Sequence, residues 1–176
     1  MSQIKVDSIV PSGGLPAGSS GGGIIQIVSA TKTDHFSSSS ASYVDITGLT
    51  ATITPQSTSN KILIHVSVQP SCDAWGGGAV HFRLLRGSTD IGSGTDGTSQ
   101  NGMSFFNTYS NNAGNTLENS VSMAMNFLDS PSTTSATTYK VQGLVTNSGY
   151  SWYVNRNAGG TLKGASSTIT LTEVSG

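Results

Sequence analysis

Two consecutive stretches decide the fold, Leu49-Thr-Ala-Thr-Ile-Thr54 and Ile62-Leu-Ile-His-Val-Ser-Val68. In both, an aliphatic residue recurs at every second position, and mostly polar residues stand between. A repeat of two places alternate side chains on opposite faces of a pleated strand. Each stretch therefore predicts a β-strand with one face toward a core and one face toward water.

The same repeat recurs along the chain and predicts about ten strands, separated by Gly, Ser, Asn and Pro clusters that favour turns. No window carries a helical stripe, so βαβ connections are absent and the strands must be mainly antiparallel. We expect an all-β fold, an antiparallel jelly-roll β-sandwich. The further segments are Ile24–Ser29, Tyr43–Ile46, Val80–Leu84, Met103–Tyr109, Val121–Phe127, Tyr139–Val145, Trp152–Val154 and Ile169–Leu171.

The composition excludes some functions and favours self-association. The 176 residues suit one domain, and only 10% are charged, with a formal net charge of -1. No basic face is available to follow a phosphate backbone, so we expect no nucleic-acid partner. The single cysteine, Cys72, closes no intrachain disulfide. A polar surface with so few charges suits packing against copies of the same chain.

The first 23 residues differ from the rest. Four aliphatic residues at Ile4, Val6, Ile9 and Val10 precede a Gly-, Ser- and Pro-rich run to Gly23. We predict an extended anchor and linker over residues 1–23 and a jelly-roll domain over 24–176, with the anchor docking on a neighbouring protein; a frayed terminus is the alternative. No signal peptide and no membrane-spanning stretch are predicted.

Several segments carry a family resemblance. Ser42–Pro55 with Ser57–Val68, then Phe82–Gly92, and finally Asn157–Val174 resemble successive strands of the β-sandwich domains in tail-fibre-like structural proteins of marine bacteriophages. Ile4–Val10 ahead of the Gly-rich linker is similar to the N-termini of cyanophage and pelagiphage virion proteins. The segment from Ser93 to Thr116 matches less well. The resemblance implies a trimeric jelly roll of the kind shared with C1q and TNF-like domains.

This resemblance implies a virion structural protein, made in the host cytoplasm, whose partners are its own copies and other virion proteins. As a fibre or appendage subunit it would attach to host surface polysaccharide. As a capsid decoration or head fibre it would need no specific ligand. A carbohydrate-active enzyme or a free lectin is the alternative from another class. The prediction is a protein without enzymatic activity.

Aromatic residues beside hydrogen-bonding side chains mark a candidate glycan site. In such pairs, the aromatic face stacks on a sugar ring and the polar side chain hydrogen-bonds to the sugar. Trp152, by contrast, fits the core alternation with Val154, and aromatic residues at strand ends also cap sandwiches. The candidate contacts are Asp73, Trp75, Tyr109, Tyr150, Tyr153, Asn155 and Arg156.

No other motif predicts chemistry. Gly92–Gly97 fits the GxGxxG pattern, but no helix follows to meet a phosphate, so we expect a loop. Asp90 and Asp96 offer sparse calcium ligands, and ordinary turn chemistry is the preferred interpretation. The histidines, His35, His65 and His81, have no zinc spacing; a metal on a threefold axis is a minor alternative. No nucleophile elbow and no close carboxylate pair occur, so neither catalytic residues nor a cofactor is predicted.

Overall fold

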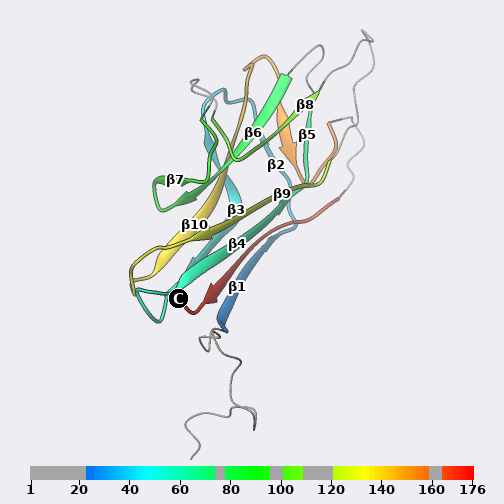
Figure 1. Ribbon diagram of the computed structural model, residues 1–176. Helices are drawn as coiled ribbons and strands as arrows, with labels where there is room; N and C mark the ends of the chain where they lie inside the picture. The colour runs from blue at the N-terminus through cyan, green and yellow to red at the C-terminus, as the bar shows by residue number, and fades with distance from the viewer. Residues whose placement is uncertain (1–22, 74–77, 96–100, 109–120, 159–163) are drawn as a thin grey trace, which may run out of the picture.

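The fold is all-β. The computed structural model describes residues 23–73, 78–95, 101–108, 121–158 and 164–176, which form twelve strands and no helix (Figure 1). No described segment is therefore a helix that could cross a membrane. The strands are β1 (Ile24–Lys32), β2 (Phe36–Ser38), β3 (Val44–Ile53), β4 (Lys61–Val68), β5 (Pro70–Cys72), β6 (Gly78–Arg86), β7 (Thr89–Ile91), β8 (Ser104–Thr108), β9 (Met123–Asp129), β10 (Thr137–Val145), β11 (Trp152–Val154) and β12 (Ser167–Val174).

The pairing of the strands is nested. β1 pairs with β12, β3 with β10, β4 with β9, and β6 with β8, all antiparallel. This is the pairing of one long hairpin rolled into two layers, as in a jelly roll. The first sheet has the order β1-β12-β4-β9, and the second has β3-β10-β6 with β7 and β8 both paired to β6. The predicted jelly-roll β-sandwich is confirmed.

The strands differ from the sequence prediction in three ways. Tyr43–Ile46 and Leu49–Thr54 belong to the single strand β3, because Gly48, at a φ of 87°, lets the chain bulge and continue. Three short strands, β2, β5 and β7, were not predicted, because none of them has two large apolar residues separated by one position, as Trp152 and Val154 are in β11. β9 begins at Met123, so Val121, expected in the core, precedes the strand and is 37% exposed.

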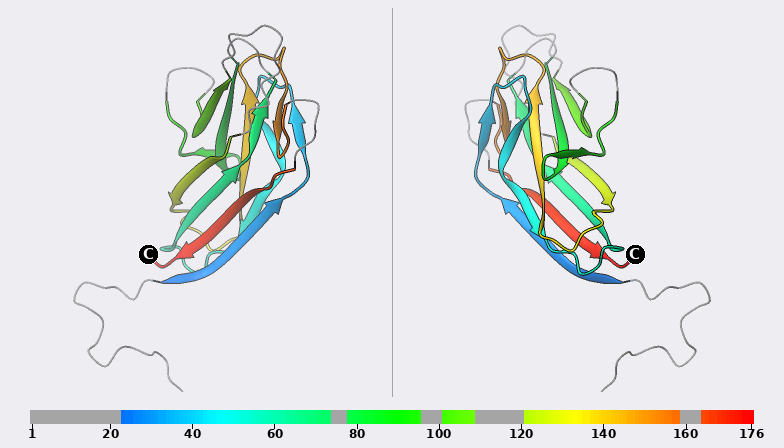
Figure 2. Two further views of the ribbon diagram at one scale, coloured as in Figure 1. Left: turned by 90° about the vertical axis from the view of Figure 1, so that its right-hand side faces the viewer. Right: turned by 90° about the vertical axis from the view of Figure 1, so that its left-hand side faces the viewer.

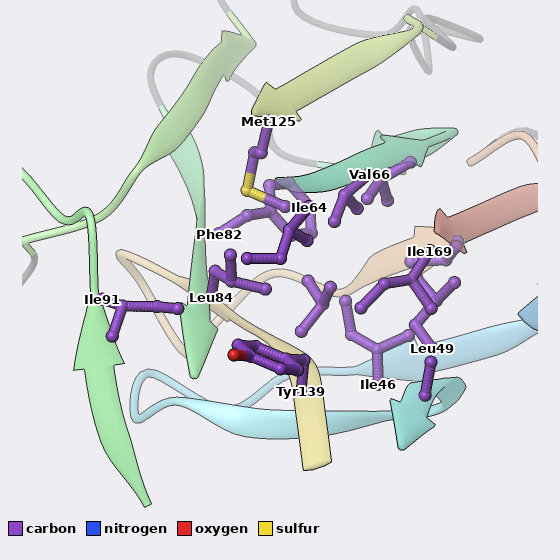
Figure 3. Close-up of a cluster of buried hydrophobic side chains, with 14 of the residues drawn as sticks. Ile46, Leu49, Ile64, Val66, Phe82, Leu84, Ile91, Met125, Tyr139 and Ile169 are labelled. Atoms are coloured by element: carbon purple, nitrogen blue, oxygen red, sulfur yellow. The ribbon is translucent and has the colours of Figure 1, made fainter. Parts of the chain in front are cut away.

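The core lies between the two sheets and follows the predicted alternation. All four inward residues of β4, from Ile62 to Val68, are at most 2% exposed. Opposite them lie Phe82 and Leu84 of β6 and Tyr139 of β10 (Figure 3). At about 1.5–3 kcal/mol for each buried large side chain, this cluster is the main source of stability.

One glycine is required by close packing. Trp152 of β11 lies against β10, and a Cβ built on Gly143 would come 2.6 Å from Cη2 of the indole ring. The ring also packs edge-on against Phe82 at a centroid distance of 5.7 Å, and tilted by 48° against Phe36 at 5.2 Å. The prediction that Trp152 belongs to the core is confirmed, with 0% exposure.

Two buried carboxylates tie the sandwich together. Asp129 of the first sheet accepts hydrogen bonds from Arg86 of the second sheet at 2.8 Å and from the Tyr139 hydroxyl at 2.6 Å. Glu173 of β12 is fully buried and accepts from the side chains of Gln26 and Asn60. Each carboxylate is paired, as burial requires.

The two ends of the sandwich differ. Ile24 and Val174 are paired, so β1 starts where β12 ends, at the same end as the C-terminus (Figure 1). The small sheet β2-β11-β5 lies at the opposite end (Figure 2). Any segment preceding β1 therefore joins the domain at the end far from β11, and the predicted boundary at residue 23 stays a prediction.

Candidate ligand-binding site

The candidate site is built on β11 at the end of the sandwich far from the C-terminus. In this strand Trp152 and Val154 are buried, and Tyr153 between them is half-buried and faces outward. β5 pairs with β11 on one side, so Asp73, which follows β5, lies beside Ser151. The predicted alternation of β11 therefore places the phenol of Tyr153 at the surface.

Three of the predicted contact residues come together here. The Tyr153 hydroxyl donates to Oδ2 of Asp73 at 3.2 Å, and the Arg156 guanidinium lies over the Tyr153 ring, 4.4 Å from its centroid. Oδ1 of Asp73 accepts from the backbone N–H of Ser151 at 2.5 Å. A carboxylate, a phenol and a guanidinium thus form one row, which we call the end cluster.

The surroundings of Tyr153 keep it protonated. Partial burial raises the pKa of its phenol, and the negative charge of Asp73 raises it further. The hydroxyl therefore serves as a hydrogen-bond donor to Asp73. Arg156 covers one face of the ring, as guanidinium groups commonly do. The arrangement presents donors and acceptors suited to a hydroxyl-rich ligand.

Asn155, predicted as a ligand contact, is a structural residue. It is 0% exposed, and its φ of 63° places it in the left-handed region that Asn tolerates. Its Nδ2 donates to the backbone oxygens of Lys32 at 2.8 Å and Asp34 at 3.1 Å, and its Oδ1 accepts from Ser167 at 2.6 Å. The side chain ties the end of β11 to β1 and β12, and no ligand reaches it in this conformation.

Other predicted contacts are not part of the end cluster as described. Tyr150 is half-buried and packs against the hydrophobic core, so its ring supports the fold. Trp75 and Tyr109 lie outside the described residues, as do the predicted anchor residues Ile4, Val6, Ile9 and Val10.

The remaining sequence candidates have structural surroundings. Asp90 accepts from Ser93 at 2.7 Å and lies 3.6 Å from the Arg83 guanidinium. β7 ends before Gly92, whose φ is 82°, and no helix follows in the described part of that loop; Asp96 lies outside it. His65 is exposed as expected, and no described group of three His, Cys, Asp or Glu residues could hold a metal.

Sequence reasoning missed a surface on the first sheet. The outward-facing residues align in cross-strand rows: Ile27, Thr172, Leu63 and Leu128 form one, and Ser29, Thr170, His65 and Asn126 form the next. A third row holds Thr31, Thr168, Ser67 and Ala124.

Ile27 is 59% and Leu128 49% exposed, and the three rows carry no formal charge when His65 is neutral. We call this surface the uncharged face. The signal was available in the sequence, because Leu63 is an aliphatic residue at a position where the repeat predicts a polar one.

Comparisons with known proteins identify no family. No family model matches the sequence, and no curated protein matches it. A solved structure of infectious bursal disease virus, Gx strain, contains a chain similar to this one, with 14% sequence identity and a TM-score of 0.40. The similarity covers 97% of this chain and 46% of the viral chain, so the present chain spans less than half of that chain's length.

Proposed function

We propose that this protein is a bacteriophage virion structural subunit, which forms homotrimeric fibres or appendages and contacts host glycans through its end cluster. The observation that carries the proposal is the uncharged face, together with its position relative to the end cluster. The resemblance of the strand segments to tail-fibre-like proteins supports the phage assignment. The role is adhesion rather than catalysis.

The uncharged face suits contact between copies. Isolated charges are costly to bury, and in these three rows none would need to be buried. Burying a fully exposed Ile or Leu contributes about 1.5–3 kcal/mol. Burying the exposed parts of Ile27 and Leu128 between copies would therefore stabilise the association. Because the rows carry no charge pattern, they do not favour a partner of complementary charge. They favour a second copy, which presents the same uncharged surface.

The two ends of the sandwich fit a displayed subunit. The chain enters β1 at the end where β12 finishes, and the small sheet with β5 and β11 lies at the other end (Figure 2). Tyr153 is in β11, and Asp73 and Arg156 follow β5 and β11 closely. Copies that associate side by side through the uncharged face would bring their end clusters together. A segment anchored in the particle would then hold these clusters outward.

The first experiment is sedimentation equilibrium of the whole chain. We expect a trimer, and a stable monomer at micromolar concentration would contradict the oligomeric part of the proposal. The glycan part is tested separately by binding of the purified protein to host cells. We expect Arg156→Ala to reduce binding without changing the oligomeric state, because it removes one hydrogen-bond donor of the end cluster and leaves the uncharged face intact.

The matched control is Lys140→Ala, a basic residue of similar size on the outward face of the second sheet. Equal binding by wild type and Arg156→Ala would remove the end cluster as the glycan contact, and no binding by the wild type would leave capsid decoration without a specific ligand as the better function. Release of reducing ends from host polysaccharide would instead replace the proposal by a carbohydrate-active enzyme.

A further inference from the structure

An exposed aromatic pair lies on the outward side of the second sheet, on strands β6 and β8, which carry none of the end-cluster residues. Phe105 of β8 is directly opposite His81 of β6, and the two rings are stacked, 5.4 Å apart and 20° from parallel. Phe105 is nevertheless 60% exposed. His81 therefore supports one face of the Phe105 ring, while much of that ring remains open to solvent.

A polar array continues along the same edge of β6. β7 and β8 both pair with this edge, so Asp90, opposite Leu85, lies on the same side of the sheet as Phe105. His81 and Leu85 are four residues apart, about 13 Å at the rise of a β-strand. Arg83 faces outward between them. Aromatic, cationic and carboxylate groups thus follow one another along a single edge.

The polar members of this array are held in place. Arg83 donates to Oε1 of Gln142 at 2.9 and 2.7 Å, and Gln142 donates to Asp45 at 2.6 Å. The Arg83 guanidinium also lies 4.1 Å from the centroid of the Tyr43 ring. Since these contacts fix the guanidinium, little side-chain entropy remains to be lost when a ligand binds.

The chemistry of the edge fits a neutral saccharide. An open aromatic face packs against the apolar face of a sugar ring, and fixed charged groups next to it bond sugar hydroxyls. Arg83 is paired with Asp90, so the edge has no excess of either charge to attract an ion. An extended apolar peptide is less suited, because only Phe105 is a large exposed hydrophobic residue on this edge as described.

We propose that Phe105, His81, Arg83 and Asp90 form a lateral binding site for a neutral oligosaccharide. The site is separate from the end cluster and does not require a trimer. It rests on the proposed function in one respect: with the uncharged face between copies, the second sheet would face outward and remain accessible.

The test is ligand-observed saturation-transfer NMR on the whole protein. The probes are neutral glucose hexasaccharides of different linkage, namely maltohexaose, cellohexaose and laminarihexaose. We expect at least one to bind and Phe105→Ala to weaken that binding about tenfold, the cost of losing one aromatic contact. Asp90→Asn, which keeps the shape of the side chain, should weaken binding by less.

Two control variants distinguish this site from the proposed function. Arg156→Ala alters the end cluster, and Leu128→Ala alters the uncharged face; both should bind the probe as the wild type does. Loss of binding in Arg156→Ala with retention in Phe105→Ala would overturn the lateral site and support the end cluster.

The absence of a saturation-transfer signal for all three probes would overturn the lateral site, since the method detects weak binding. A change of oligomeric state in Phe105→Ala, measured by sedimentation, would also overturn it and show that the edge is a contact between copies.

Discussion

The two sheets have the same construction on the inside and opposite characters on the outside. In the three aligned rows of the first sheet, the outward residues are aliphatic, hydroxyl-bearing or amide side chains and the imidazole of His65. On the second sheet, the ion pair between Lys140 and Asp45 and the Arg83–Gln142 hydrogen bonds occupy the outward positions of β3, β10 and β6. The difference indicates which sheet can lose its water: removing solvent from the charged face is costly, and from the uncharged face it is favourable.

The largest expected effect comes from placing a charge on the uncharged face. Leu63→Asp should weaken association about a thousandfold or more, because an unpaired carboxylate would have to be buried between copies. Sedimentation equilibrium measures the change. Thr52→Asp puts the same charge on an exposed position of the second sheet and should associate like the wild type. Equal behaviour of the two variants would remove the distinction between the faces.

A smaller effect is expected where the two sheets are joined. Tyr139→Phe removes the hydroxyl that donates to Asp129 at 2.6 Å and should cost about 1–3 kcal/mol of unfolding free energy, the range for unpairing a buried polar group. Urea unfolding at fixed protein concentration measures it. Tyr43→Phe makes the same chemical change at a half-buried residue, where the hydroxyl donates to the backbone oxygen of Asn101. An equally large loss of unfolding free energy in Tyr43→Phe would show that the burial of the Tyr139 hydroxyl is not the cause of the loss in Tyr139→Phe.

Glu173 gives the domain part of its acid sensitivity. Burial raises the pKa of this carboxyl, but hydrogen bonds from Gln26, Asn60 and the Gln56 backbone outweigh it and hold the pKa below its ordinary value. A carboxyl with a lowered folded-state pKa stabilises the fold above its unfolded-state value, and this contribution is lost as the pH falls through the folded-state value. Glu173→Gln should therefore be less stable at neutral pH and lose less stability between neutral and acidic pH. An unchanged slope of unfolding free energy against pH would contradict this.

The smallest effect is expected at Asp45, the exposed counterpart of Glu173. Hydrogen bonds from Lys140 and Gln142 lower the pKa of Asp45, so its contribution is also lost on acidification. Solvent screens this group, and Asp45→Asn should cost less than about 1 kcal/mol. The same urea titrations at two pH values measure it. A cost as large as that of Glu173→Gln would mean that the outward face of the second sheet is shielded from water.

The sequence predicted the core because burial and alternation are local. The positions in β4 and β12 follow the repeat of two, and their inward residues are buried. It could not predict how Asn155 is used, because its hydrogen-bond partner Lys32 is 123 residues away. Nor could it assign β5 and β11 to a third small sheet, because strands of three residues are defined only by their neighbours.

The candidate site was only partly predicted, because contacts between residues far apart in the chain cannot be read from local sequence. Asp73 and Tyr153 were singled out as residue types, yet only the pairing of β5 with β11 brings them within hydrogen-bonding distance. The stacking of Phe105 on His81 likewise depends on the register between β8 and β6. The sequence showed which residue types could bind a ligand, but which of them lie side by side depends on the pairing of strands that are far apart in the chain.

The nested pairing has a consequence for the order in which the protein is made. β1 leaves the ribosome before the other described strands, but its partner β12 follows all of them, and β4, which pairs with β12, must also wait. Unpaired, partly apolar strands therefore persist while the strands between β1 and β12 are made, and such long-range pairing forms slowly. Rapid synthesis followed by posttranslational folding suits this topology better than folding strand by strand.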